Sequence, residues 1–266
     1  MVLHVQAYGK GRPVVMLPSF SLDHAAMAEA VEPVFAPVAS WRRLYIDLPG
    51  TGRSPPGEPR SDVVVDEVID AIRSELGGRR FAVAGWSCGG YLAAGVTRRL
   101  PQQVSGLMMV CAGFKIRPED RDLTGVLPST PQPGWLDHVP PALHDHFTHA
   151  VGSQTAKVGE RILAALARNG PTDETYLASL REDGFAFSDE AAPTPCNAPV
   201  CFLTGHRDRV IGFASLFGAL GSYDHATYIS ISGAGHYLPP RAARGFAAVT
   251  HAWLAQCEAL LDTDDN

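Results

Sequence analysis

The sequence lacks any apolar run that approaches the length needed to span a bilayer. Basic residues occur singly or in short runs such as Arg42-Arg43 and Arg79-Arg80, and the 266 residues carry a net charge of −6. We therefore expect no membrane segment and no nucleic-acid partner. Residues 1–6 show no basic segment followed by an apolar core, so we expect a cytoplasmic, soluble protein without an export signal.

Cysteine is scarce and irregularly spaced. The five cysteines are an odd number, and Cys196 and Cys201 lie too far apart for a C-x-x-C redox or zinc motif. This usage favours free thiols in a reducing compartment over a disulfide framework. The sequence also has no internal repeat and no low-complexity segment.

Metal and cofactor motifs are missing as well. Histidines and aspartates gather between residues 137 and 149, but their spacing does not give the H-E-x-x-H helical pair, and Pro140-Pro141 interrupts them. A solvated surface explains this group better than a zinc site. Its members are Asp137, His138, His144, Asp145, His146 and His149. Gly50-Thr51-Gly52 lacks the lysine of a phosphate loop, so we expect neither a cofactor nor a metal.

Apolar runs alternate with helical patterns over the first part of the chain. Residues 14–17, 43–47, 81–85 and 104–111 have the continuous apolar character of strands that are buried on both faces. Between them, residues 62–76 carry apolar side chains at helical spacing. This alternation predicts an α/β protein with a parallel sheet and helices on both of its faces.

The alternation stops between residues 115 and 195. This stretch has no strong strand signal, contains proline clusters and carries two or three helical segments. Strand patterns return at residues 199–205 and 226–231. We therefore predict a core made of residues 1–114 and 196–266, and a helical lid of residues 115–195 inserted into it.

Residues 81–95 contain the most informative motif. A buried strand runs into an alanine-rich helix through a turn in which Gly85, Ser87 and Gly89 form the pattern G-x-S-x-G. Such a tight turn forces the apex residue into a strained conformation and requires small neighbours. The apex serine would be held above the sheet at the positive end of the following helix. The pattern predicts that Ser87 is a nucleophile.

A serine hydroxyl needs a histidine to accept its proton and an acid to orient that histidine. Asp208 follows the strand at 199–205, and His236 lies in a glycine-flanked loop after the strand at 226–231. Loops at the carboxyl ends of neighbouring parallel strands converge on one crevice. We therefore expect these three side chains to meet, although Asp208 could instead cap a helix.

Four segments together resemble the α/β-hydrolase-fold superfamily, in its serine-nucleophile branch with a small helical lid. They are the turn at residues 85–89, the loop at 47–54, the acid turn at 205–208 and the histidine loop at 233–236. The resemblance extends from residue 14 to the final helix and does not include the lid. It implies a mostly parallel sheet of the eight-stranded type, flanked by helices, with the lid inserted after the sixth strand.

The resemblance also implies roles. Ser87 would be the nucleophile, His236 the general base and acid, and Asp208 the orienting carboxylate. Two backbone N–H groups would form the oxyanion hole, those of Cys88 and Phe20. In the loop that carries Phe20, the family's usual His-Gly is replaced by Pro18-Ser19. The oxyanion hole needs only backbone donors, so it could survive this departure.

Substrate-pocket candidates come from the loops and from aromatic residues of the lid. We expect Trp86, Ser19, Trp135, Phe147 and Tyr237 to line the pocket. Tyr176, Phe185 and Phe187 are further aromatic residues of the lid, and core packing explains them equally well. We expect a small-molecule substrate that is small to medium in size and largely uncharged, and we leave a homodimer open.

The function that these residues predict is hydrolysis of an ester, thioester or lactone. The same machinery in related folds also cleaves carbon–carbon bonds, makes peracids or transfers acyl groups, and the motifs do not separate these reactions. A different alternative is a ligand sensor with little turnover. Packing is a better explanation than chemistry for the side chain of Cys88, which follows the apex of the turn.

Overall fold

The computed structural model describes residues 2–238 and 243–264, and its described strands form one seven-stranded sheet. The sheet has the spatial order β1-β3-β2-β4-β5-β6-β7, with β1 antiparallel to β3 and every other pair parallel. The strands are β1 (Val5–Tyr8), β2 (Arg12–Leu17), β3 (Trp41–Ile46), β4 (Phe81–Trp86), β5 (Val104–Val110), β6 (Val200–Gly205) and β7 (Ala226–Ile231).

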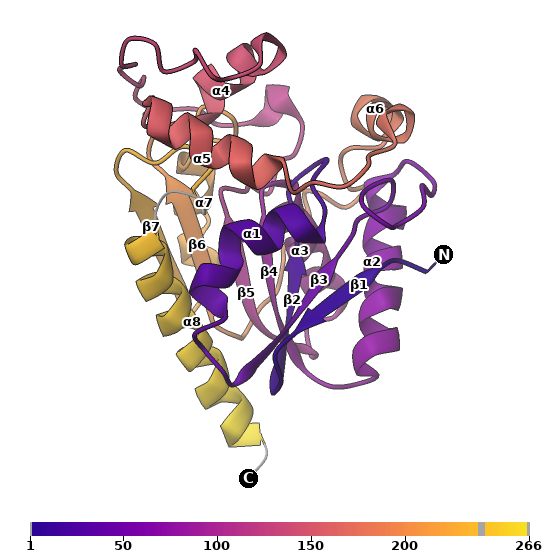
Figure 1. Cartoon of the computed structure of the whole chain (residues 1–266). Coiled ribbons are helices and arrows are strands. Elements are labelled where there is room, and N and C mark those ends of the chain that lie inside the picture. Colours follow the sequence, from indigo (N-terminus) through magenta and orange to yellow (C-terminus); the bar gives the residue numbers. More distant parts are fainter. Residues whose placement is uncertain (1, 239–242, 265–266) are drawn as a thin grey trace.

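Helices cover both faces of the sheet (Figure 1). Helices α1 (His24–Phe35) and α8 (Ala243–Asp264) lie on one face, and α2 (Ser61–Leu76) and α3 (Cys88–Arg99) lie on the other. Successive residues of a strand point to opposite faces, so Val14 packs with the first pair of helices and Val15 with the second. The central strands therefore have no polar face, which explains their continuous apolar runs.

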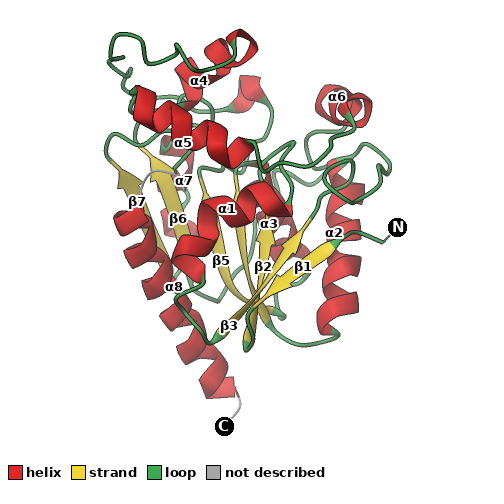
Figure 2. Cartoon of the chain, in the orientation of Figure 1, coloured by secondary structure: helices red, strands yellow, loops and turns green. Residues whose placement is uncertain are grey.

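The chain between β5 and β6 contributes no strand to the sheet. It carries α4 (His144–Ala150), α5 (Ala156–Leu166), α6 (Glu174–Asp183) and two short 3-10 helices, Pro118–Asp120 and Pro141–Leu143. These elements gather beyond the edge at which the parallel strands end (Figure 2). We call residues 115–195 the insertion.

Backbone hydrogen bonds attach the insertion to the core. The N–H of Gly52 donates to Pro171 at 2.8 Å, and the N–H of Asp173 donates to Gly50 at 2.8 Å. Further along, the N–H of Ser61 donates to the carbonyl of Gly184 at 2.8 Å. The helix α7 (Ala214–Gly218) and a 3-10 helix, Leu220–Ser222, connect β6 to β7.

The predicted strands and helices of the core are confirmed, and the side chain of Asp23 caps α1 by accepting from the N–H groups of Ala25 and Ala26. The strand count differs from the eight-stranded type. Only one described strand, β1, precedes β2, because few residues are available there, so the insertion follows the fifth strand in chain order and not the sixth.

All five cysteines are buried free thiols. Among the helices of the described residues, none combines the length and the apolar character that a membrane crossing requires.

Candidate active site

Ser87 lies at the apex of the turn between β4 and α3. Its φ of 55° falls in the left-handed region, which costs energy for a residue with a side chain. A Cβ on Gly85 would lie 2.1 Å from the carbonyl oxygen of Gly89, and a Cβ on Gly89 would lie 2.1 Å from that of Leu17. The two glycines therefore let the start of α3 pack against the ends of β4 and β2, as the motif predicts.

His236 links Ser87 to Asp208. Its Nε2 lies 2.9 Å from Oγ of Ser87, and its Nδ1 lies 2.9 Å from Oδ2 of Asp208. Because a carboxylate only accepts hydrogen bonds, Nδ1 carries the proton and Nε2 is left to accept from the serine hydroxyl. All three residues are buried. The structure thus brings together the three side chains that the sequence singles out.

The carboxylate of Asp208 is fixed from two sides. Its Oδ1 accepts from the N–H groups of Val210 and Ile211 at 2.9 and 3.0 Å, so its Oδ2 is aimed at His236. The next helix, α7, has Phe213 and not Asp208 at its N-cap. Asp208 therefore closes a loop turn, and the helix-cap alternative is wrong.

The loop that carries His236 is held by both the core and the insertion. The backbone N–H of His236 donates to the carbonyl of Ala150 at 2.7 Å, and the carbonyl of His236 accepts from the indole N–H of Trp86 at 3.0 Å. A Cβ on Gly235 would lie 2.4 Å from the carbonyl oxygen of Ala150. The C-terminal end of α4 therefore packs directly against the histidine loop and fixes its position.

The two residues predicted to supply the oxyanion donors line the same cavity as Ser87. Cys88 is the first residue of α3, and Phe20 lies in a turn closed by a 3.0 Å bond from the N–H of Leu22 to the carbonyl of Ser19. In the part of the chain that the structure describes, neither backbone N–H donates to another protein group. Both donors remain available for a ligand.

Ser87 and His236 open into a cavity of about 510 Å³. Its core wall is formed by Ser19, Phe20, Ser21, Leu22, Ser87, Cys88, Val210, Ile211, His236 and Tyr237. Its insertion wall is formed by Ile116, Pro118, Arg121, Leu143, His146, Leu166, Arg181 and Phe185. The cavity therefore lies between the carboxyl ends of the parallel strands and the inserted helices, which is where open α/β sheets bind ligands.

In a comparison with known protein families, residues 12–183 match the family described as the alpha/beta hydrolase fold. The chain belongs to this family.

Curated relatives of this α/β-hydrolase include the pimeloyl-[acyl-carrier protein] methyl ester esterase of Shewanella woodyi. It is 28% identical over 182 residues, which are 68% of this chain and 62% of the relative. The esterase of the same name from Xanthomonas oryzae pv. oryzae is 26% identical over 253 residues, covering 88% of this chain and 91% of the relative. The first curated relatives are matched over 60–62% of their own length.

Solved structures agree with the fold of this α/β-hydrolase. An alpha/beta superfamily hydrolase from Oenococcus oeni PSU-1 superposes with a TM-score of 0.85 at 23% identity and covers 96% of both chains. A thermophilic esterase from Thermogutta terrifontis gives a TM-score of 0.71 at 18% identity, covering 96% of this chain and 93% of the other. At these identities the likeness establishes the fold alone.

Three of the expected pocket residues of this α/β-hydrolase do not line the cavity. Trp86 is buried behind the histidine loop, where its indole N–H is used by the carbonyl of His236. Trp135 and Phe147 pack into a separate apolar cluster within the insertion, so they support the cavity from behind. Tyr237 connects this cluster to the cavity, because it lines the cavity and its ring centre lies 6.0 Å from that of Phe147. Of the five residues expected to line the pocket, Ser19 and Tyr237 do so.

Most of the insertion wall was not predicted. Phe185 was expected as an aromatic residue of the lid, and it does line the cavity. Arg121, Arg181 and His146 also line it, and His146 contacts the hydroxyl of Tyr237 at 2.8 Å. No local pattern marks these residues, because their place depends on how the insertion folds back over the sheet.

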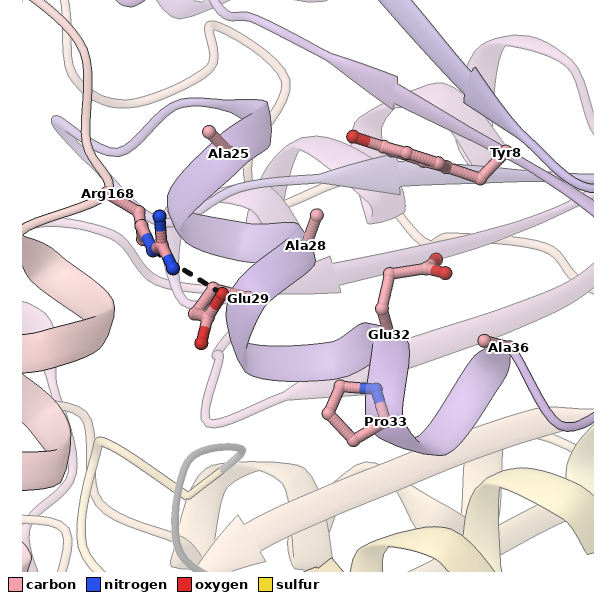
Figure 3. A pocket seen from close by; sticks show the side chains of 8 residues that line it. All are labelled: Tyr8, Ala25, Ala28, Glu29, Glu32, Pro33, Ala36 and Arg168. Carbon is pink, nitrogen blue, oxygen red and sulfur yellow. Dashed lines mark ion pairs between the residues drawn. The ribbon is translucent and has the colours of Figure 1, made fainter.

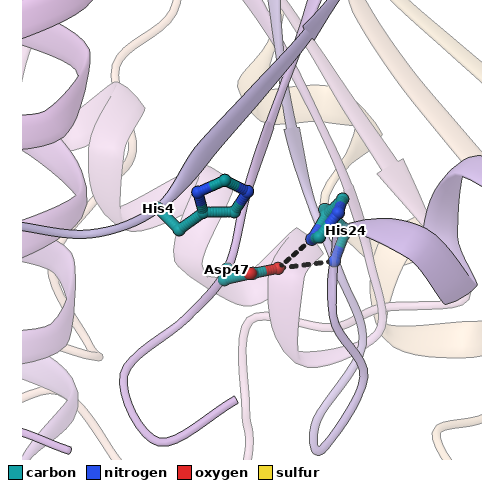
Figure 4. A group of neighbouring side chains, drawn as sticks. All are labelled: His4, His24 and Asp47. Carbon is teal, nitrogen blue, oxygen red and sulfur yellow. Dashed lines mark hydrogen bonds and ion pairs between the residues drawn. The ribbon is translucent and has the colours of Figure 1, made fainter. Parts of the chain in front are cut away.

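Among the described residues, one group of three side chains could offer ligand atoms to a metal ion. It consists of His4, His24 and Asp47 (Figure 4). The carboxylate of Asp47 is already occupied. One oxygen accepts from the backbone N–H of His24 at 2.7 Å and contacts its Nδ1 at 2.8 Å, and the other accepts from the N–H of Arg53 at 2.9 Å. This geometry is that of a hydrogen-bonded support for the loop after β3.

The histidines and aspartates at 137–149 likewise do not converge as a metal site within the described part of the chain. His144 contacts the carbonyl of Val139 at 2.8 Å, and His149 contacts that of Asp145 at 2.8 Å. The side chains of His144 and His149 are therefore paired with nearby backbone carbonyls.

A second hollow lies beside α1, and Ser87 is not among its lining residues (Figure 3). It is lined by Tyr8, Ala25, Ala28, Glu29, Glu32, Pro33, Ala36 and Arg168. Its charged groups are engaged, because Glu29 pairs with Arg168 at 3.6 Å and Glu32 pairs with Arg43 at 2.7 Å. This hollow has no nucleophile and no unpaired charge among its lining residues.

Proposed function

We propose that this α/β-hydrolase cleaves carboxylic esters through an acyl-enzyme on Ser87. The observation that carries the proposal is the continuous chain from Asp208 through His236 to Ser87, with both contacts at 2.9 Å, at the base of a cavity of about 510 Å³. A cavity of this size accommodates a small to medium organic molecule.

In the first half of the reaction, Oγ of Ser87 attacks the ester carbonyl while Nε2 of His236 takes the hydroxyl proton. The backbone N–H groups of Cys88 and Phe20 stabilise the negative charge on the carbonyl oxygen. The carbon–oxygen bond to the alcohol then breaks, and the alcohol leaves with the proton from His236. The acyl group remains on Ser87.

In the second half, water attacks the acyl-enzyme and gives its proton to His236. The bond to Ser87 breaks, the proton returns to Oγ, and the carboxylic acid is released. The buried carboxylate of Asp208 stabilises the imidazolium in both halves and keeps the ring in the required tautomer. The sum of the two halves is ester plus water giving acid plus alcohol.

The curated relatives favour an ester over the other bonds that this machinery could cleave, because those described above are methyl ester esterases. We further propose that residues 115–195 act as a cap that selects the substrate. Eight of the cavity's lining residues come from this insertion, and they face the core wall that carries Ser87. Specificity would then be determined by the insertion and chemistry by the core.

The first test is the intact mass of the protein after incubation with a fluorophosphonate probe. The wild type should gain one adduct, and Ser87→Ala should gain none. Ser188→Ala, which removes an exposed serine outside the cavity, should be labelled like the wild type. Turnover of simple methyl and p-nitrophenyl esters should follow the same order.

A folded wild-type protein that gains no adduct and hydrolyses no ester would contradict the proposal and favour the ligand sensor. Labelling that persists in Ser87→Ala would place the reactive group elsewhere.

A further inference from the structure

Two arginines of the insertion wall differ from the paired arginines of this chain. Arg121 and Arg181 line the cavity beside Ser87. Within residues 2–238 and 243–264, neither guanidinium lies within ion-pair distance of a carboxylate, whereas that of Arg98 contacts Asp189 at 2.6 Å. Two positive charges therefore border the reactive cavity without a contacting counter-charge from the protein.

The guanidinium of Arg121 is held in place by backbone carbonyls. Its Nε and Nη2 donate to Ile116 at 3.1 and 2.6 Å, and its Nη1 donates to Val210 at 3.1 Å. Three of its five N–H groups are used in this way, and two remain. Neutral carbonyls orient the group but do not neutralise it, so Arg121 is a preorganised positive donor in the cavity.

The electrostatic environment supports this description of Arg121. Burial, counteracted in part by the negative charge of Asp208, lowers the pKa of the Arg121 guanidinium, and the positive charge of Arg181 lowers it further. The two arginines are thus close enough to repel each other. An anion bound beside them would relieve this repulsion.

Arg181 lies near the C-terminal end of α6, and its side chain has no hydrogen bond within the described residues. Its Cζ lies 4.4 Å from the centre of the Phe20 ring, which is a cation–π contact with the core wall. The chain just after α6 is anchored, because Ser61 bonds to the carbonyls of Gly184 and Phe185 at 2.8 and 2.6 Å. Arg181 is therefore held over the cavity with its N–H groups available.

We propose that Arg121 and Arg181 bind an oxyanion, a carboxylate or a phosphate, on a substrate whose ester lies at Ser87. A planar guanidinium matches the paired oxygens of these groups, and hydrogen bonds between charged partners are the stronger ones. The protein's net charge of −6 would otherwise disfavour an anionic substrate. This inference rests on the proposed esterase function and replaces the expectation of a largely uncharged substrate.

The test compares esters that differ only in charge. Monomethyl esters of linear dicarboxylic acids, with a free carboxylate at the far end, are paired with monomethyl esters that end in a carboxamide. Acetate esters of phosphorylated and unphosphorylated diols form a second pair, which places the anion on the leaving group. In the wild type, kcat/KM for the anionic member of at least one pair should be higher by about tenfold or more.

The variants Arg181→Gln and Arg121→Gln should each lower that preference, measured as the ratio of kcat/KM for the anionic ester to kcat/KM for the neutral ester, by about tenfold or more. Arg117→Gln is the matched control, since Arg117 lies on the same loop as Arg121 but does not line the cavity. Arg121 also anchors its loop, so Arg121→Lys, which keeps the charge, separates a loss of charge from a loss of folding. Arg181 is exposed, and its variant should fold normally.

Equal turnover of charged and neutral esters by the wild type, with no change in the ratio for Arg181→Gln, would overturn the subsite and leave the esterase intact. Failure to hydrolyse any ester would instead count against the esterase. In that case calorimetric binding of the dicarboxylate monoester to Ser87→Ala still decides the subsite, because Arg181→Gln should weaken that binding by about tenfold. Unchanged binding would overturn it.

Discussion

The core wall and the insertion wall of the cavity are built on different principles. Each catalytic candidate of the core wall follows a strand end, and its position is fixed by the backbone. The φ of 55° at Ser87 and the two backbone bonds to the carboxylate of Asp208 are examples. The insertion wall is assembled from side chains spread between Ile116 and Phe185, which meet only because the chain folds back over the sheet.

The two walls therefore differ in how many amino-acid substitutions they tolerate. A side chain at Gly85 or Gly89 would collide with backbone at 2.1 Å, so the turn around Ser87 tolerates little change. Residues of the insertion wall contact the cavity by their side chains and can be exchanged within a retained fold. We therefore expect substitutions in the core wall to abolish turnover and substitutions in the insertion wall to change the choice of substrate.

Among substitutions that test the difference between the two walls, we expect the largest loss of kcat for Asp208→Asn in the core wall. The Asn carbonyl oxygen can still accept from Val210 and Ile211, but its NH2 group cannot accept from Nδ1 of His236. The imidazole would then adopt the wrong tautomer, and kcat should fall by about 10⁴-fold. Steady-state ester hydrolysis measures the effect.

Asp173→Asn is the control for this substitution, because Asp173 caps α6 and lies outside the cavity. It should keep wild-type kcat within about threefold. A fall of less than about tenfold for a folded Asp208→Asn would mean that Asp208 does not orient the histidine, and the role assigned to the core wall would fail.

The core wall could be predicted from the sequence because its geometry leaves a local trace. The glycines beside Ser87, the glycine-flanked His236 and the position of Asp208 after a strand are all visible without the structure. The same holds for the central strands, whose continuous apolar runs follow from burial on both faces. The strand count was less accessible, since the resemblance implied one more strand than the described sheet contains.

A smaller effect is expected for Leu166→Ala in the insertion wall. Removing this side chain enlarges the cavity and should lower kcat/KM for esters with long apolar acyl chains by about tenfold, mainly through KM. Labelling of Ser87 by a small fluorophosphonate should be unchanged. A full series of acyl chain lengths, measured for wild type and variant, gives the comparison.

Leu163→Ala is matched to it, since Leu163 lies on the same helix, is also partly buried and does not line the cavity. It should destabilise the insertion without changing the preference for chain length. If both leucine variants shift the preference equally, the insertion acts through its stability and not through contact with the substrate.

The insertion wall could not be predicted because aromatic and charged residues give the same sequence signal whether they line a cavity or pack behind it. Trp135 and Phe147 were expected at the surface of the pocket, yet they stabilise the insertion by packing with Ile162 and its neighbours. Arg121 and Arg181 lie 60 positions apart in the sequence, and they line the same cavity only because the insertion folds back over the sheet.

The smallest effect is expected for Cys88→Ala, and it tests whether the core wall acts through backbone or side chain at this position. Burial raises the pKa of the Cys88 thiol to about 12, so the thiolate is scarce at neutral pH and the sulfur is a poor nucleophile. Alanine keeps the backbone N–H that we assign to the oxyanion hole. Because only that N–H is needed, kcat/KM should stay within about threefold of wild type, and iodoacetamide should leave wild-type activity unchanged. A large loss in Cys88→Ala, or rapid inactivation by the reagent, would give the thiol a direct part in the reaction and would move the chemistry of this wall from its backbone to its side chains.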